Sequence, residues 1–172
     1  MTTRTHWILI AAIAALALSR LLPHPPNFSP VVAVALFGGA ALTKRWLAFA
    51  VPLAAMLVAD VFIGFHNTMT FVYAGMALVV VIGNALGKHR QPVVLVGAAL
   101  GGSAVFFLIS NAGVWWLGGI YSHSMEGLVT CFTAALPFFH NTVLSTLFYV
   151  VVLFGLESWL QRHPQQEAMV RG

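Results

Sequence analysis

Long apolar runs, separated by short polar breaks, dominate the chain. A helix needs roughly 20 apolar residues to cross a hydrocarbon core of about 30 Å. By this measure the predicted spans are Trp7–Leu22, Pro30–Thr43, Trp46–Ile63, Thr70–Gly87, Pro92–Ala112 and Phe138–Leu160. We expect an all-α integral membrane protein, with one six-transmembrane-helix bundle over residues 1–160 and a polar cytoplasmic tail over residues 161–172.

The composition excludes other classes of protein. Of the 172 residues, 60% are hydrophobic and 7% are charged, and the mean hydropathy is +0.91. Soluble domains carry about 25% charged residues, so this chain is neither a soluble enzyme nor a disordered segment. The net charge is +4, but the eight Lys and Arg residues are scattered, and no nucleic-acid partner is expected. The single cysteine, Cys131, excludes a disulfide framework.

The basic residues predict the orientation of the spans. Cytoplasmic loops collect Lys and Arg, and here alternate loops hold nearly all of them, with Arg20 as the exception. The residues expected on the cytoplasmic side are Arg4, Lys44, Arg45, Lys88, Arg90, Arg162 and Arg171. Both termini should therefore be cytoplasmic. A secretory signal cleaved near Ala15–Leu16–Ala17 is the alternative, but its loss would disturb this alternation, so we expect a permanent helix.

Rare polar residues collect on the outward-facing side of this topology. They are Arg20, His24, Asn27, Asp60, His66, Asn67, Asn111, Tyr121, His123, Glu126, His140 and Asn141. Polar groups at membrane depth are costly and usually face a cavity or a partner. The asymmetry therefore predicts an outward-facing pocket.

The second span is too short for a bilayer. Pro30–Thr43 has 14 residues, which makes a helix of roughly 21 Å. Ser29 is expected to be its N-cap and Pro30 its first helical residue. The preceding proline-rich segment, Pro23–Phe28, must then dip below the outer surface. Non-helical backbone at that depth is tolerated only inside protein or against water, so this segment should line the pocket.

The chain before the last span should also lie at the outer face. Gly127–Leu160 would make a helix of roughly 51 Å, which is too long for one span. We expect Pro137 to break it, so that Gly127–Leu136 folds over or re-enters the outer face. His140 and Asn141 would then open the sixth helix beside the pocket.

The stretch Gly113–Met125 combines glycines with aromatic residues, which is typical of a lid. Together with the polar outer groups, it defines the candidate substrate-binding residues. These are His24, Asn27, Phe28, Asp60, His66, Asn111, Trp115, Trp116, Tyr121, His140 and Asn141. No cofactor is expected.

Two of the outer features have alternative interpretations. Asp60 either forms an ion pair with Arg20 or contacts a ligand, and the two roles are compatible. The outer histidines are chemically able to bind a transition metal. They lack HxxxH or HExxH spacing, so no metal site is assigned. The four histidines are His24, His66, His123 and His140.

The first span carries small residues at Ala11, Ala15 and Ser19, which recur every four residues. Such a face allows close approach of another helix. It either packs inside the bundle or forms a docking surface for another membrane protein.

Several motifs carry a family resemblance. The run Arg20-Leu-Leu-Pro-His-Pro-Pro-Asn-Phe-Ser-Pro-Val, continuing to Ala35-Leu-Phe-Gly-Gly-Ala, resembles an uncharacterised bacterial membrane family grouped with the S components of energy-coupling-factor (ECF) transporters. Shorter matching pieces extend the resemblance over roughly residues 20–155. They are Asp60 with Gly64-Phe65-His66, Phe106-Phe107 with Asn111 and Trp115, and Leu136-Pro-Phe-Phe-His-Asn141.

The resemblance implies a six-helix S component of the bacterial inner membrane that holds a vitamin-like small molecule near the outer face. In characterised S components a small-residue face on the first helix meets the coupling subunit. Ala11 and Ala15 fit that pattern, although Ser19 replaces a third alanine. Related solitary S components take up cobalamin, so a corrinoid is the expected substrate. The Cys ligand of one such group has no counterpart, because Cys131 lies in another segment.

Three functions remain open at this stage. A transporter would need partner ATPases and a coupling subunit, or run downhill, because the chain has no GxxxxGK[ST] phosphate loop. An intramembrane enzyme would use Asp60 with His24, His66 or His140, but no nucleophile–base spacing supports it. A scaffold subunit would tolerate changes in the pocket. We expect the transporter and no enzymatic activity.

Overall fold

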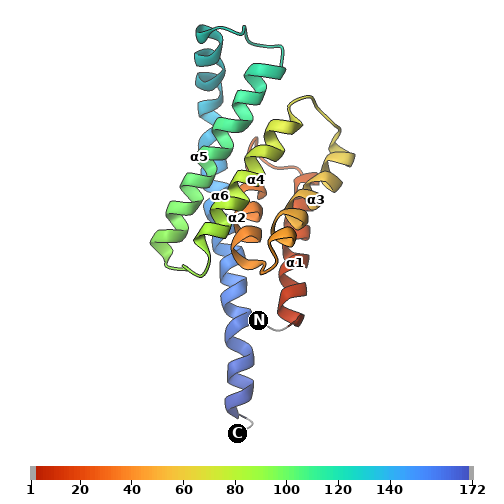
Figure 1. Ribbon diagram of the computed structural model, residues 1–172, viewed down its shortest axis with the longest axis vertical. Helices are drawn as coiled ribbons and strands as arrows, with labels where there is room; N and C mark the ends of the chain where they lie inside the picture. The colour runs from red at the N-terminus through yellow and green to blue at the C-terminus, as the bar shows by residue number, and fades with distance from the viewer. Residues whose placement is uncertain (1–2, 171–172) are drawn as a thin grey trace.

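The computed structural model describes residues 3–170, with side chains for residues 5–162, and all regular structure in this part is helical. Its elements are α1 Thr3–Leu18, the 3-10 helix η1 Ser19–Leu21, α2 Val31–Ala41, α3 Arg45–Ile63, α4 Met69–Leu86, α5 Pro92–Leu117 and α6 Met125–Val170 (Figure 1). Arg171 and the side chain of Arg4, both used to predict the orientation, lie outside the described part.

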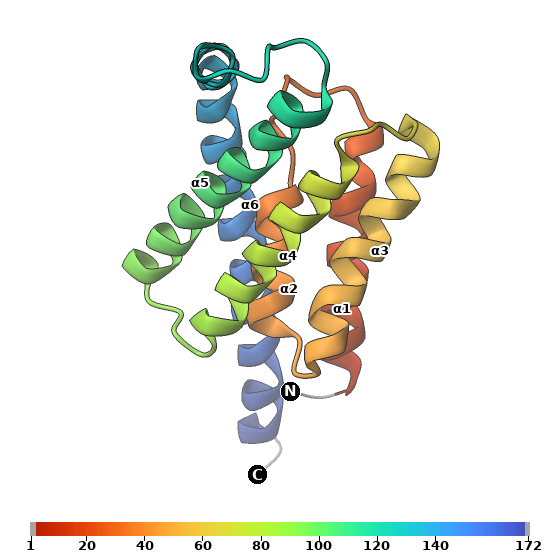
Figure 2. The same cartoon turned by 45° about the horizontal axis from the view of Figure 1, so that its top comes forward.

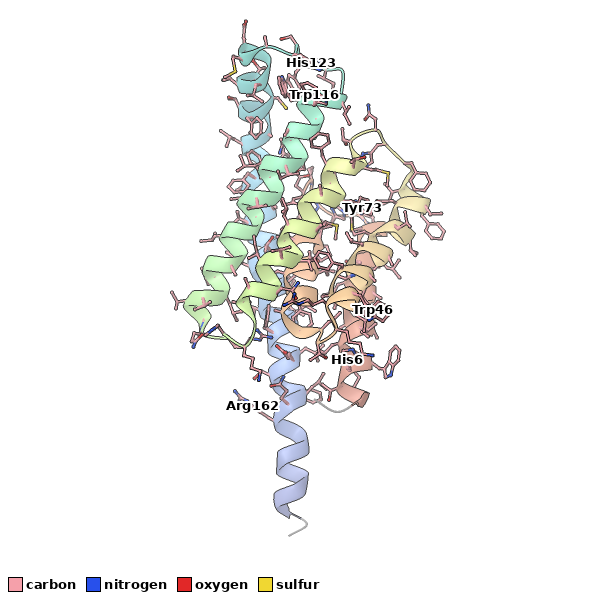
Figure 3. All side chains as sticks on the ribbon, in the orientation of Figure 1. His6, Trp46, Tyr73, Trp116, His123 and Arg162 are labelled. Carbon is pink, nitrogen blue, oxygen red and sulfur yellow. The ribbon has the colours of Figure 1, made fainter. Side chains whose placement is uncertain are left out.

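The six α-helices run alternately in opposite directions (Figures 1 and 2). The α2–α3 and α4–α5 connections lie at the same end as the start of α1, and Arg162 lies toward this end on α6 (Figure 3). We call it the basic end, because it holds Lys44, Arg45, Lys88 and Arg90. The opposite end holds the α3–α4 and α5–α6 connections and the segment between η1 and α2. We call it the pocket end.

Four helical segments are long and apolar enough to cross a membrane, which indicates a membrane protein. They are Arg45–Ile63, Met69–Leu86, Pro92–Leu117 and Met125–Arg162. Large apolar side chains such as Val93, Phe62 and Val151 are more than 70% exposed, as expected of helices whose outer surface meets lipid. The other two predicted spans are shorter in the structure, with 16 residues in α1 and 11 in α2.

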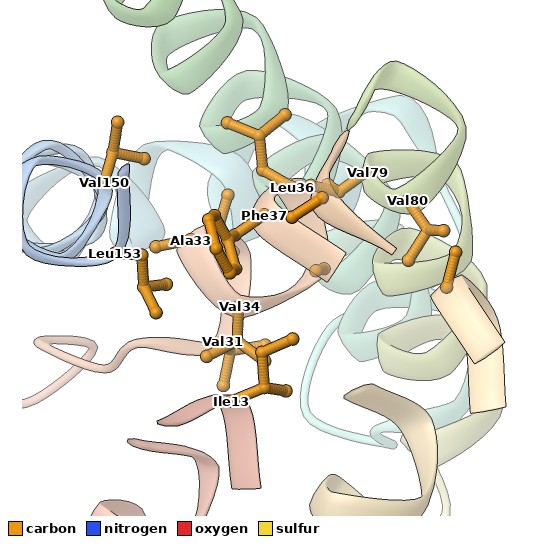
Figure 4. Packing of buried hydrophobic residues seen from close by; sticks show 14 of the residues in the cluster. Ile13, Val31, Ala33, Val34, Leu36, Phe37, Val79, Val80, Val150 and Leu153 are labelled. Carbon is orange, nitrogen blue, oxygen red and sulfur yellow. The ribbon is translucent and has the colours of Figure 1, made fainter. Parts of the chain in front are cut away.

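Helix α2 forms the centre of the core. Every residue from Val31 to Gly39 is buried, and α2 packs against the other five α-helices. Figure 4 shows its side chains among Ile13 of α1, Val79 of α4 and Leu153 of α6. With 11 residues, α2 is about 16 Å long. The prediction of a second helix too short to span the bilayer is confirmed.

The predicted start of this helix is wrong by one residue. Pro30 is the N-cap, and its carbonyl accepts the first helical hydrogen bond from the Val34 N–H at 2.8 Å. Helix α2 therefore begins at Val31. The Ser29 hydroxyl makes no capping bond and has no hydrogen-bond partner within the described residues.

The predicted lid is much shorter than Gly113–Met125. Helix α5 continues to Leu117, which leaves Gly118–Ser124 as the connection to α6. Gly113 is buried because α4 passes close to it, and a Cβ at this position would lie 2.6 Å from Cγ of Phe71. This glycine provides close helix packing rather than flexibility.

The predicted break at Pro137 is also wrong. Helix α6 runs without interruption from Met125, so Gly127–Leu136 is helical and His140 and Asn141 lie within the helix. A proline removes one helical hydrogen bond, whereas unwinding in apolar surroundings would expose several backbone groups at greater cost. The same helix continues through the predicted tail to Val170.

Candidate functional site

A cavity of about 520 Å³ lies at the pocket end. Its wall is built by η1, the segment between η1 and α2, the start of α2, and parts of α3, α4, α5 and α6. The polar side chains that line it are Arg20, His24, Asn27, Ser29, His66, Thr68, Ser110, Asn111 and Thr142. The apolar side is formed by Val31, Val32, Met56, Ile63, Val72, Phe106, Phe107 and Val114.

The segment between η1 and α2 is held in place at two points. The Asn141 amide on α6 donates a hydrogen bond to the Pro26 carbonyl at 2.9 Å. Phe28 packs against Phe148 and Tyr149, with ring centroids 6.5 and 6.3 Å away. These contacts fix the segment so that His24 and Asn27 line the cavity. The segment lies lower than the α5–α6 connection in Figure 1. Its expected position below the outer membrane surface stays a prediction.

Arg20 and Asp60 form the ion pair that the sequence analysis considered. The Arg20 Nη1 lies 3.0 Å from Oδ1 of Asp60 and 3.1 Å from Sδ of Met56. The second carboxylate oxygen accepts a hydrogen bond from the Tyr73 hydroxyl at 2.7 Å. Asp60 is only 1% exposed, whereas Arg20 lines the cavity. The acid therefore sits behind the cavity wall and positions the arginine.

Two further predicted site residues line the cavity, His66 from the α3–α4 connection and Asn111 from α5. His66 follows α3, and its Nδ1 lies 2.8 Å from the Thr68 hydroxyl. Asn111 on α5 donates a hydrogen bond to the Phe107 carbonyl at 2.8 Å. Both side chains are therefore oriented by local hydrogen bonds beside the apolar wall.

The remaining aromatic candidates gather elsewhere. Trp116 stacks on His123 with ring centroids 5.3 Å apart, and Trp115 donates a hydrogen bond to the Ser122 carbonyl at 2.9 Å. Figure 3 shows Trp116 and His123 at the tip of the α5–α6 hairpin, away from Tyr73. None of the predicted residues Trp115, Trp116, Tyr121 and His140 lines the cavity.

The structure therefore divides the candidates into three groups. His24, Asn27, His66 and Asn111 line the cavity. Asp60, Asn141 and Phe28 support its wall through Arg20 and the connecting segment. Trp115, Trp116, Tyr121 and His140 lie outside it.

Sequence reasoning missed several lining residues on the helices. Ser110 and Thr142 directly adjoin the predicted residues Asn111 and Asn141, and both line the cavity. Tyr73, which orients Asp60, was missed as well. The sequence signal that could have identified these residues was a hydroxyl group inside an otherwise apolar span.

A second polar cluster at the basic end was also missed. Arg90 Nε lies 3.0 Å from Oε2 of Glu157, and Nη2 donates to the Ala40 carbonyl at 3.0 Å. Arg90 also donates to the Gly87 carbonyl and lies 4.9 Å from the centroid of the Phe154 ring. Glu157 is 5% exposed. The sequence signal that could have identified this cluster was Glu157, an acid within the last predicted span.

The structure gives no support to a metal centre. Within residues 5–162, no group of three or more His, Cys, Asp or Glu side chains is arranged to hold a metal ion. Cys131 is buried, and its thiol donates to the Asn111 backbone carbonyl at 3.6 Å. It behaves as a small core residue.

The small-residue face of the first helix points away from the bundle. Ala11 and Ala15 are exposed, whereas Leu9, Ile13 and Ala17 are buried. Packing inside the bundle therefore does not explain the two alanines. Ser19 is half-buried, and its hydroxyl donates to the Leu16 carbonyl at 2.6 Å.

Comparison with known proteins identifies the family of the chain and nothing narrower. No curated protein matches the chain, and no solved structure matches it. Residues 1–168 match DUF6580, which is described as a family of unknown function, and the chain therefore belongs to that family.

Proposed function

We propose that this protein is the substrate-binding membrane subunit, of the S-component type, of an uptake system for a vitamin-like small molecule. The observation that carries the proposal is the cavity of about 520 Å³ at the pocket end. Small-molecule sites typically measure about 300–1,000 Å³ and combine apolar walls with a few polar groups. This cavity has both kinds of wall.

The proposed orientation places the basic end in the cytoplasm, in accordance with the positive-inside rule. In a bacterial inner membrane, the cavity would then open to the external side. The four apolar helical segments and the alternating course of the six α-helices support this arrangement. Uptake would begin with capture of the molecule from outside.

The chemistry of the wall favours binding over catalysis. An acid–base pair needs its two groups within hydrogen-bond reach of each other. Asp60 is instead held by Arg20 and Tyr73, and it does not line the cavity. His66 is bonded to Thr68 rather than to a carboxylate.

The outward-facing alanines support a partner in the membrane. Ala11 and Ala15 provide a smooth exposed surface on α1, on which another helix can approach closely. We propose an ECF coupling subunit at this surface, with its ATPases supplying the energy. The bulky variants Ala11→Leu and Ala15→Leu should then prevent assembly without emptying the cavity.

The cavity volume favours a molecule smaller than a corrinoid. A corrinoid would have to remain partly outside a space of about 520 Å³. A corrinoid remains the substrate that the family resemblance implies, and uptake by a cobalamin auxotroph is the part of the test below that checks it.

The test is native mass spectrometry of the protein purified from cells grown in rich medium, combined with uptake by vitamin auxotrophs that express the chain. We expect a co-purifying small molecule that is lost when Ser110→Phe fills the cavity. The matched control is Thr130→Phe, because Thr130 is exposed on α6 and outside the cavity wall. Absence of any bound molecule together with no uptake, with or without a coupling module, would overturn the proposal.

A further inference from the structure

We infer, building on the proposed ligand-binding function, that the cavity takes a molecule bearing a single carboxylate, held between the Arg20 guanidinium and the N-terminus of α2. Three observations converge on this chemistry. The first is that Arg20 has hydrogen-bond donors without a partner among the residues that the structure describes. The second is that a side chain bonds the C-terminal end of α2, whereas its N-terminal end faces the cavity. The third is the absence of an acid from the described cavity wall.

Arg20 uses only part of its donor capacity. A guanidinium has five N–H donors in a planar fork. Only Nη1 is bonded in the structure, to Asp60 and Met56, so Nε and Nη2 have no partner among the described residues. The Arg20 side chain is 19% exposed and lines the cavity. A carboxylate can accept two parallel hydrogen bonds from such a free edge.

The two ends of α2 differ in a way that points to a missing anion. At the C-terminal end, Arg90, which is itself paired with Glu157, donates to the Ala40 carbonyl and so satisfies one of the last carbonyls of the helix. At the N-terminal end, Val31 and Val32 line the cavity. The first N–H groups of a helix have no acceptor within it. Helix N-termini inside membrane proteins commonly face an anionic group of the substrate.

No protein carboxylate at the cavity wall supplies that anion. The ionisable side chains that line it are Arg20, His24 and His66, and no Asp or Glu is among them. Asp60 has both oxygens occupied, by Arg20 and Tyr73. The Ser29 hydroxyl lines the same region and, shielded from solvent, has no hydrogen-bond partner in the described part of the chain. It is one more group able to donate to a bound carboxylate.

The charge balance favours a single negative charge. Asp60 already neutralises Arg20, so the uncompensated charge is the helix terminus, worth roughly half an elementary charge. One carboxylate suits this environment, whereas a phosphate dianion would leave excess negative charge beside the apolar wall. Phe106, Phe107 and Val72 provide an apolar wall for the body of the molecule.

The test uses benzoate and benzamide, two probes with the same planar body that differ in charge. Binding to the full chain in lipid nanodiscs is measured by calorimetry at fixed ionic strength. We expect the dissociation constant of benzoate to be about tenfold lower than that of benzamide, as charge-assisted hydrogen bonds would give. Equal affinities, or binding of neither probe, would overturn the inference.

Variants of Arg20 test whether this side chain causes the preference for benzoate over benzamide. Arg20→Lys keeps a cation for Asp60 but lacks the planar fork, so we expect most of the preference for benzoate to disappear. Arg20→Gln combined with Asp60→Asn removes both charges without leaving a buried unpaired acid, and should lose the preference too. Arg162→Gln, an exposed arginine toward the basic end, is the matched control and should retain it. An unchanged preference in both Arg20 variants would place the carboxylate elsewhere and overturn the inference.

The outcomes separate this inference from the proposed function. A chain that binds benzoate through Arg20 but supports no uptake keeps the carboxylate site and loses the transport role. A chain that co-purifies with an uncharged molecule and supports its uptake keeps the transport role and overturns the carboxylate site.

Discussion

Gly39 of α2 and Gly83 of α4 lie against each other where the two helices cross. A Cβ built on Gly39 would lie 3.0 Å from Cα of Gly83 and would also collide with the Val80 carbonyl. A Cβ built on Gly83 would collide with the Leu36 carbonyl. Small residues allow this close approach of helix backbones in membrane proteins. The crossing fixes the central helix, and so the cavity at its N-terminal end.

Alanine at Gly83 should therefore destabilise the fold. The added methyl group would meet the backbone of α2, which cannot move aside as a flexible side chain can. We expect Gly83→Ala to lower the free energy of unfolding by about 3 kcal/mol, as measured by denaturant titration in mixed micelles. Gly97→Ala is the control, because a Cβ at Gly97 on α5 has no neighbour within 4 Å. It should be neutral or stabilising by up to about 1 kcal/mol. Equal effects of the two substitutions would contradict the close crossing.

Removing Arg90 should cost more than removing its partner's charge. Arg90→Ala leaves Glu157 buried without its cation and the Ala40 carbonyl without its donor, so we expect a loss of about 3–5 kcal/mol. Glu157→Gln leaves Arg90 bonded to the backbone carbonyls of Ala40 and Gly87, and its effect should be smaller. The same unfolding titration checks this order, and a larger loss in Glu157→Gln would contradict it.

Much of the fold could be predicted from local patterns in the sequence. The apolar runs predicted the cores of α3 and α4 closely, and the 14-residue run Pro30–Thr43 predicted a helix too short for the bilayer. The alternation of basic loops agrees with the alternating course of the helices. The Arg20–Asp60 pair could also be predicted from the sequence, because a cation and an acid at the ends of neighbouring helices seldom stay unpaired in apolar surroundings.

The remaining features could not be predicted from the sequence, because they depend on which residues come into contact in the folded protein. Gly113 has the composition of a lid but is buried against Phe71, so α5 extends beyond its predicted end. Pro137 looks like a helix breaker, but α6 continues through it because unwinding would leave more backbone groups without partners. Arg90 and Glu157 are 67 residues apart in the chain. No local pattern brings them together.

Tyr73 should act on the cavity through Asp60. Its hydroxyl donates to the carboxylate at 2.7 Å, and a hydrogen bond to a charged group contributes about 1.5–3 kcal/mol. We expect Tyr73→Phe to destabilise the protein by about that amount. A double-mutant cycle with Asp60→Asn should give a coupling energy of about 1 kcal/mol or more. Tyr121→Phe in the α5–α6 connection is the control and should show no coupling to Asp60. Additive effects of Tyr73→Phe and Asp60→Asn would contradict the role of Tyr73 in orienting the acid.

Asn141 should control the mobility of the cavity wall rather than the stability of the whole protein. Its amide bonds the Pro26 carbonyl, 115 residues away in the chain, in a segment with no regular structure of its own. Asn141→Ala removes this attachment at a cost of about 1 kcal/mol but leaves the buried core of α2 intact. We expect faster amide hydrogen exchange in residues 20–30 and weaker ligand binding, with unchanged exchange in α4. His140→Ala is the neighbouring control, because the exposed His140 side chain does not line the cavity. If Asn141→Ala and His140→Ala gave the same exchange rates in residues 20–30, the Asn141–Pro26 bond would not hold this wall in place.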